Sequence, residues 1–161
     1  YWKLAFNKSI KLRKMENQRD EEGRLIINNQ KEFFDRCVDE NKNIDARNVR
    51  LQFELNLSEL ELYKELGRVL FQNSIFENHV SFNGLMNVSG DADFSNATFS
   101  RDANFSRVVF LRNANFSKAL FSNNANFEGI LFLKDVNFEG ATFSNNANFR
   151  AGLFKNITNF T

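Results

Sequence analysis

The stretch ANFSRVVFLRNANFSKALFSNNANFEGILF, residues 103–132, decides the fold, because phenylalanine recurs in it at alternating intervals of five and six residues. The alternation continues on both sides without a break. The phenylalanines that share this register are Phe94, Phe99, Phe105, Phe110, Phe116, Phe121, Phe127, Phe132, Phe138, Phe143, Phe149, Phe154 and Phe160. The sequence unit is therefore eleven residues long, and two units make 22.

The residue two places before each of these phenylalanines is in most cases small. On a helix, at about 100° per residue, a step of five residues turns a side chain by about 140°, so the rings would point to both faces. On a strand, two residues separated by one point to the same side. The pattern therefore favours short strands with the small residue and the ring inside, separated by polar corners.

Segments such as Ala103-Asn104-Phe105-Ser106, Ala125-Asn126-Phe127-Glu128 and Gly140-Ala141-Thr142-Phe143-Ser144 resemble the repeats of bacterial pentapeptide-repeat proteins, in the variant centred on phenylalanine. The resemblance covers residues 71–161. It implies a mainly β fold, a right-handed quadrilateral parallel β-helix, here with 22 residues per coil and about four coils. Rings 22 residues apart are then expected to stack in columns.

Residues 1–70 have a different composition and predict an α-helical N-terminal region that caps the β-helix. An alternation of apolar and polar residues predicts a strand over about 49–57. Ser58 and Glu61 form a capping box, which predicts a helix over about 59–68 that covers the first coil. A longer helix is expected within about 8–41.

The beginning of the chain allows two interpretations. Tyr1 and Trp2 precede a run of basic residues with no acidic residue before Glu16, which is typical of the cytoplasmic exit from a membrane helix. The same pattern also fits the basic start of an ordinary helix. Some pentapeptide-repeat proteins carry membrane helices before the repeats, so we expect a cytoplasmic protein, or one held at the cytoplasmic face of the membrane through residues preceding Tyr1.

The sequence offers no constellation for catalysis. It contains one cysteine, Cys37, and one histidine, His79, and the two lie in regions of different character. No metal-ligand spacing and no phosphate-binding loop occur, so we predict no catalytic residues, no metal and no cofactor. We therefore predict that the chain is not an enzyme.

One group of residues breaks the polar character of the predicted outer surface. Residues on either side of an inward phenylalanine point outward, and around Phe110, Phe132 and Phe154 several of them are aliphatic. These candidate interface residues are Val109, Leu111, Leu131, Leu133 and Leu153. A contiguous exposed apolar patch usually marks an interface. Either the N-terminal helix covers this stripe, or a protein partner or a second copy of the chain binds it. The C-terminal coil offers a second surface for a homodimer.

We therefore expect a non-enzymatic structural and protein-interaction module. The alternative is a DNA mimic that binds and protects a topoisomerase such as gyrase, a role known for some pentapeptide-repeat proteins. That role needs a strongly acidic rod, whereas residues 71–161 hold seven acidic and seven basic residues and the whole chain has a formal charge of +1. The same balance predicts no nucleic-acid partner.

Overall fold

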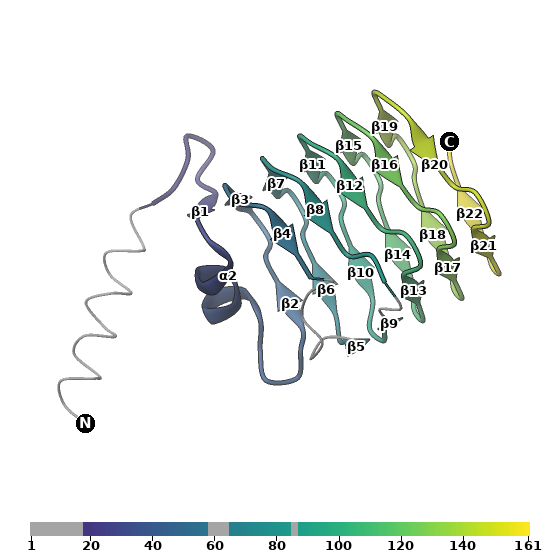
Figure 1. Ribbon diagram of the computed structural model, residues 1–161, viewed down its shortest axis with the longest axis horizontal. Helices are drawn as coiled ribbons and strands as arrows, with labels where there is room; N and C mark the ends of the chain where they lie inside the picture. Colours follow the sequence, from purple (N-terminus) through teal and green to yellow (C-terminus); the bar gives the residue numbers. More distant parts are fainter. Residues whose placement is uncertain (1–17, 58–64, 85–86) are drawn as a thin grey trace.

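The computed structural model describes residues 18–57, 65–84 and 87–161, and it is a parallel β-solenoid of about six turns with one helix among these residues. Short strands wind repeatedly around a common axis, and the helix α2 lies at the N-terminal end of the stack (Figure 1). The predicted mainly β fold is confirmed, and the strands form four parallel sheets.

The four sheets form the sides of the solenoid, and each complete coil contributes one strand to each sheet. Sheet A holds β1 (Leu25–Ile27), β3 (Val49–Leu51), β7 (Ile75–Phe76), β11 (Thr98–Phe99), β15 (Leu120–Phe121) and β19 (Thr142–Phe143). Sheet B holds β2 (Ile44–Asp45), β6 (Val69–Leu70), β10 (Ala92–Asp93), β14 (Ala114–Asn115), β18 (Val136–Asn137) and β22 (Thr158–Asn159). Sheet C holds β4 (Leu55–Asn56), β8 (Val80–Ser81), β12 (Ala103–Asn104), β16 (Ala125–Asn126) and β20 (Ala147–Asn148). Sheet D holds β5 (Glu65–Leu66), β9 (Asn87–Val88), β13 (Val109–Phe110), β17 (Leu131–Phe132) and β21 (Leu153–Phe154). The helix α2 spans Gln30–Cys37.

The solenoid begins earlier than the sequence predicts. Coil strands are already present in β2, β3 and β4, so the predicted boundary at residue 70 and the count of about four coils are both wrong. The pairing offset is 22 residues from Ala92 onward but 25 between Ile44 and Val69. In this first coil, leucine also stands at three of the four positions equivalent to phenylalanine, and alanine stands at the fourth. The phenylalanine period therefore cannot be seen in the sequence there.

The prediction of a capping helix over 59–68 is also wrong for the residues of this range that the structure describes. Glu65–Leu66 forms β5 and pairs with β9, so this part is a coil strand, while residues 58–64 lie outside the described part of the chain. The single strand predicted over 49–57 is two strands, β3 and β4, which belong to different sheets. Apolar alternation continues around the corner between them because both sheets face the same core.

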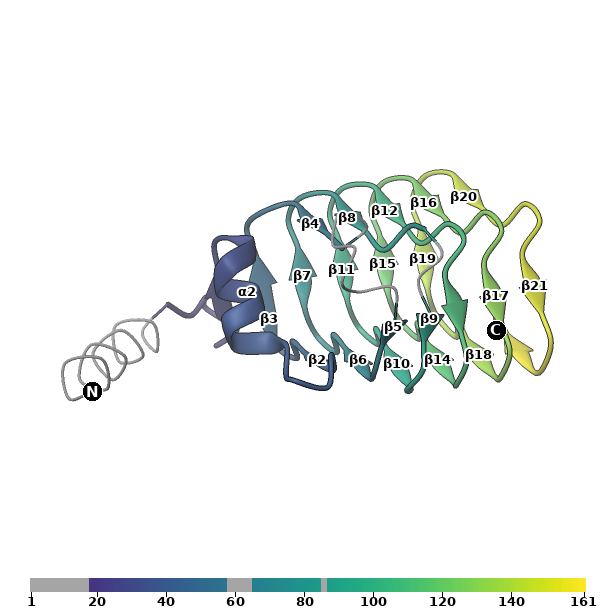
Figure 2. The same ribbon diagram turned by 60° about the horizontal axis from the view of Figure 1, so that its bottom comes forward.

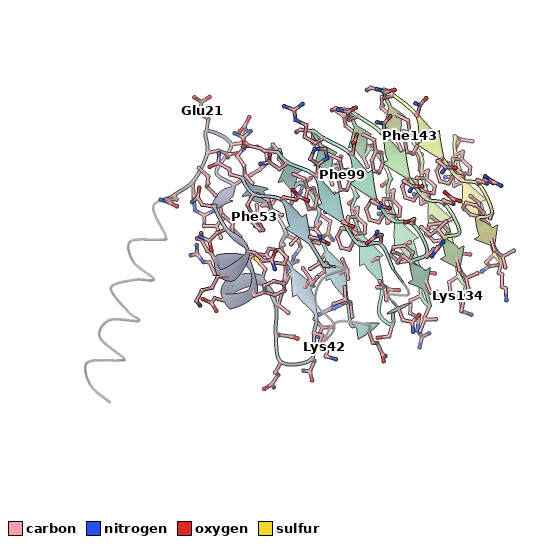
Figure 3. The ribbon with its side chains drawn as sticks, in the orientation of Figure 1. Glu21, Lys42, Phe53, Phe99, Lys134 and Phe143 are labelled. Atoms are coloured by element: carbon pink, nitrogen blue, oxygen red, sulfur yellow. The ribbon has the colours of Figure 1, made fainter. Side chains whose placement is uncertain are left out.

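Phenylalanine rings fill the interior in columns parallel to the solenoid axis. The rings of Phe105, Phe127 and Phe149 stack with centroid distances of 5.2 and 4.7 Å and interplanar angles of 4° and 2°. Neighbouring columns meet edge to face, as between Phe116 and Phe127 at 88°. Phe99 and Phe143 can be seen inside the stack in Figure 3. Of the register phenylalanines, those from Phe94 to Phe138 are buried, those at 143, 149 and 154 are half-buried, and Phe160 is 57% exposed.

Asparagine before the inward ring has a local role. The side-chain oxygen of Asn104 accepts a hydrogen bond from the backbone N–H of Ser106, and Asn126 does the same for Glu128. Asp93, which stands where other coils carry asparagine, accepts from the N–H of Ser95. These Asx turns begin the corners that follow the strands of sheets B and C. The side-chain amide of Asn148 also donates to the side-chain oxygen of Asn126 in the preceding coil, at 3.2 Å.

The N-terminal end of the stack is covered by α2 (Figure 2). The side chain of Asn29 caps the helix by accepting from the N–H of Glu32. Phe33 is fully buried, and its ring lies parallel to that of Phe71 at 6.0 Å. The first coil carries the small Ala46 at the position equivalent to Phe71, which follows from the pairing of Asp45 with Leu70. The Phe33 ring therefore extends the column from outside the coils.

A cluster of charges holds the segment before α2 against sheet A. Asp20 lies 3.2 Å from Arg24 and 3.3 Å from Arg50, and Arg24 also donates to the carbonyl of Asn73. Desolvation alone would raise the pKa of Asp20. The hydrogen bonds from Arg24 and the charges of both arginines outweigh it, so the pKa of this carboxyl is lowered.

The corners between sheets B and A require a left-handed residue, and this gives a testable prediction. Lys118 has φ 55° as the third residue of a turn closed by the bond from Ala119 N to Phe116 O. Gly140 fills the equivalent position with φ 63°. We expect Lys118→Gly to raise the free energy of unfolding by about 0.5–1 kcal/mol, because glycine adopts this conformation without a Cβ clash. Urea denaturation measures it. The control is Lys134→Gly, where φ is not positive; equal effects at the two positions would contradict the explanation.

Candidate functional site

The outer face of sheet D carries the aliphatic residues that the sequence marks as a candidate interface. Val109 pairs with Leu131, and Leu131 pairs with Leu153, so the three side chains stand one above another along the solenoid axis. Their sequence neighbours Phe110, Phe132 and Phe154 point into the core, where two of the three rings are fully buried. Because successive strand residues alternate between faces, the three aliphatic residues point outward.

A second aliphatic column runs beside the first. Leu111 and Leu133 follow the inward rings of Phe110 and Phe132, and their backbone N–H groups donate to carbonyls of the preceding coil, at Val88 and Phe110. These bonds fix the register that brings the two leucines together. Val109, Leu111, Leu131 and Leu133 are half-buried and Leu153 is 51% exposed. We call these five residues the sheet D stripe.

The stripe has a defined beginning. In the two earlier coils, its first column continues with Glu65 and Asn87, both polar, and Ser89 stands where later coils have leucine. On sheet C, the corresponding outward column consists of Asn104, Asn126 and Asn148. An aliphatic outer column that continues over three coils is therefore a local property of sheet D.

Basic side chains border the stripe on both sides. Arg107 and Arg150 lie at the corner between sheets C and D, and Arg112, Lys134 and Lys155 lie at or next to the corner between sheets D and B. Lys134 projects from the edge of the stack in Figure 3. All five are exposed, and residues 91–161 contain only seven lysines and arginines in total. The balanced charge of the repeats therefore conceals a concentration of bases around one face.

The acidic residues near the stripe are engaged with their own chain. Glu128 accepts from the side-chain amide of Asn148, and Asp135 accepts from the backbone N–H of Ile157. Within the part of the chain that the structure describes, none of the five bases forms an ion pair. Glu128 and Asp135 keep their charge at these corners, but they are not paired directly with the bases, and the five bases outnumber the acids around the stripe.

The described helix does not cover the stripe. Through Phe33, α2 packs on the ring of Phe71 at the end of the stack, and it leaves the outer face of sheet D uncovered (Figure 2). At the other end, the rings of the last coil are the least buried of the core, and Ile157 beside them is 69% exposed.

The residues with reactive side chains are kept apart. Cys37 is buried in the last turn of α2, whereas His79 lies between β7 and β8 on the surface, with Nδ1 3.7 Å from a carboxylate oxygen of Asp102. Over residues 18–57, 65–84 and 87–161, no three His, Cys, Asp or Glu side chains gather as metal ligands would. None of the helices formed by these residues has the length and apolarity needed to span a membrane.

Comparison with known proteins agrees with the coil geometry. The family model for pentapeptide repeats, in nine copies, matches residues 86–131. This chain carries pentapeptide repeats. The matched segment includes the strands from β9 to β16, which form two of the regular 22-residue coils. Searches of curated proteins and of solved structures found no match.

The pentapeptide repeats explain why sequence reasoning reached only part of this site. The stripe follows from the repeat period, because residues 22 apart stack. The flanking bases, by contrast, occupy corner positions that differ from coil to coil, such as Arg107 and Arg150. Only the assignment of each corner to a pair of sheets brings them to the same face. Sorting the charged residues by their position within the 22-residue period would have found them.

Proposed function

We propose that this pentapeptide-repeat chain is a non-enzymatic structural and protein-interaction module whose binding face is the sheet D stripe. The observation that carries the proposal is the in-register stacking of Val109, Leu131 and Leu153 on an outer face that no described element covers. A rigid column of aliphatic side chains loses little conformational entropy on binding, because strand pairing already fixes its spacing. Burying it against a partner removes apolar surface from water.

The interior supports a scaffold role. Stacked rings fill it, and the described part of the chain holds no group of three His, Cys, Asp or Glu side chains placed as metal ligands. Outward side chains are consequently the means by which this fold can recognise other molecules. Among the outward columns, the stripe differs most from the asparagine-rich surface around it.

The charge distribution gives no support to the alternative of a DNA mimic. Such a mimic presents rows of carboxylates that imitate the phosphates of a duplex. Here the outward column of sheet C is asparagine, and bases border sheet D. A supercoiling assay with gyrase and an inhibitor would reverse this ranking if stoichiometric protein protected the enzyme.

A pair of leucines in one coil tests the proposal. Leu131 lies in the stripe, whereas Leu120 is also half-buried on an outer face but belongs to sheet A and stacks between Thr98 and Thr142. We expect Leu131→Asp to keep the circular dichroism of the parent and to weaken self-association or partner binding about tenfold or more, since a charge in a buried apolar contact is costly. Leu120→Asp should leave binding unchanged.

Sedimentation velocity measures self-association of the two variants. A photo-crosslinking amino acid at position 131 or 120 then tests for a partner in cells. The proposal expects crosslinked species that depend on position 131 and disappear when Leu111→Asp is added. Equal crosslinking from both positions would reject the stripe as the binding face. Unfolding of Leu131→Asp but not of Leu120→Asp would show that the chain itself covers the stripe.

A further inference from the structure

The charged border of the stripe specifies the chemistry of its partner, and this inference rests on the function proposed above. We propose that the sheet D stripe binds an amphipathic α-helix whose aliphatic face is flanked by Asp and Glu. Exposed bases stand on both sides of the stripe, at Arg107 and Arg150 on one side and at Arg112, Lys134 and Lys155 on the other. A partner with acidic flanks would complement both rows.

The spacing of the stripe fits a helix laid along the solenoid axis. Neighbouring coils are about 4.8 Å apart, so the three levels from Val109 to Leu153 extend over about 10 Å. A helix rises about 5.4 Å per turn and places residues i, i+3 or i+4, and i+7 on one face. Two turns of such a helix therefore present one aliphatic residue to each level of the stripe.

The width between the basic rows also fits. Arg107 and Arg112 belong to one coil and are five residues apart, so the chain between them can span at most about 18 Å. An α-helix with its side chains is about 10–12 Å across. A helix on the stripe would therefore lie between the rows, with acidic side chains on its flanks within reach of the guanidinium and ammonium groups.

Two other classes of partner fit less well. Nucleic acid would place phosphates along the middle of the face, where the stripe offers Leu131 and Leu133 instead of hydrogen-bond donors. A membrane surface requires apolar side chains that penetrate between lipids. Four of the five stripe residues are half-buried in a flat sheet face, and only Leu153 is more than half exposed.

Three synthetic helical peptides test the proposal on the full chain. All carry leucine at i, i+3, i+4 and i+7, and their flanks consist of glutamate, glutamine or lysine. We expect the glutamate peptide to bind about tenfold more tightly than the glutamine peptide and the lysine peptide to bind weakest, with the difference shrinking as salt is added. Isothermal titration calorimetry or fluorescence anisotropy measures the affinities.

Charge reversal identifies the face. The double variant Arg112→Glu with Lys134→Glu should lose about tenfold in affinity for the glutamate peptide. The double variant Arg101→Glu with Lys118→Glu removes the same charge from exposed positions at corners away from sheet D and should bind as the parent does.

The other outcomes of the peptide experiment reject the acidic helical partner, each in a different way. If the glutamine peptide binds as tightly as the glutamate peptide and Leu131→Asp abolishes both, the stripe is a binding face but the acidic partner is wrong. If no peptide binds, the proposal of a helical partner is wrong. Crosslinking from position 131 then tests separately whether the stripe is a binding face. Binding to vesicles of phosphatidylcholine and phosphatidylglycerol that depends on Arg112 and Lys134, without binding of the glutamate peptide, would replace the protein partner with a lipid surface.

Discussion

Replacing Phe127 with alanine is expected to lower the free energy of unfolding by about 3–5 kcal/mol, among the largest effects of any single substitution in the solenoid. The ring is fully buried, stacks on Phe105 and Phe149 and meets Phe116 and Phe138 edge to face. Alanine would leave a cavity that four rings in fixed columns cannot fill by small movements. Urea denaturation followed by circular dichroism measures the loss.

Phe160 provides the matched control. It belongs to a column with Phe138, at 5.1 Å, but it is 57% exposed in the last coil. Phe160→Ala removes the same atoms with much less burial, and we expect a loss of about 1 kcal/mol or less. Equal losses at the two positions would mean that stability does not depend on stacking inside the coils.

The second large effect is expected at the N-terminal cap. Phe33→Ala should destabilise the cap by about 3–5 kcal/mol, because the ring is fully buried and occupies the space above Phe71 that Ala46 leaves open. Among the described residues, no other ring stacks parallel to Phe71 on this side. Lys31→Ala, on the same helix with a side chain 77% exposed, should cost less than about 0.5 kcal/mol.

Cys37 reports on the cap directly. It is buried in α2, and burial raises the pKa of its thiol to about 12. In the parent protein we expect the thiol to react slowly with Ellman's reagent at neutral pH, since the reactive thiolate is scarce and covered. Phe33→Ala should accelerate the reaction at least tenfold, and Lys31→Ala should not. Equal rates in the parent and Phe33→Ala would contradict the assigned role of the ring.

The raised pKa of Cys37 also gives the cap a dependence on pH. The folded state favours the neutral thiol, so its contribution is complete below the ordinary pKa of 9.0. The contribution is lost as pH rises from 9 toward about 12. Cys37→Ser should show less of this loss than the parent when unfolding of the cap is followed across the same range.

The regular coils could be predicted from the sequence because their core uses one residue type at one spacing. Every coil from Phe94 onward repeats after 22 residues, and the strands pair with that offset. The spacing of six residues between Phe82 and Val88, where the alternation requires five, also marks one extra residue in the sequence. The pairing offset changes accordingly from 23 residues at Val80 to 22 at Asn87. In each case the number of residues in one sequence repeat equals the offset between paired strands of neighbouring coils.

The first coil could not be predicted, because its core does not use one residue type at one spacing. Its core consists mostly of aliphatic residues such as Leu51, Leu55 and Leu66, and its offset to the next coil is 25 for three of the four sheets. The strongest signal in this part of the sequence is local: the capping box at Ser58 and Glu61 predicts a helix, although Glu65–Leu66 is a strand. Long-range pairing with β9 determines the conformation of these two residues, and no local pattern contains that information.

Methyl NMR tests most directly whether sheet D is the face of the solenoid that binds a partner. The full chain, labelled at the methyl groups of leucine, isoleucine and valine, is titrated with the glutamate-flanked peptide. We predict that the methyl signals of Val109, Leu131 and Leu153 shift while those of Ile75 and Leu120 on sheet A do not. Shifts centred on sheet A or on Ile157 in the last coil, with the stripe unchanged, would contradict the account.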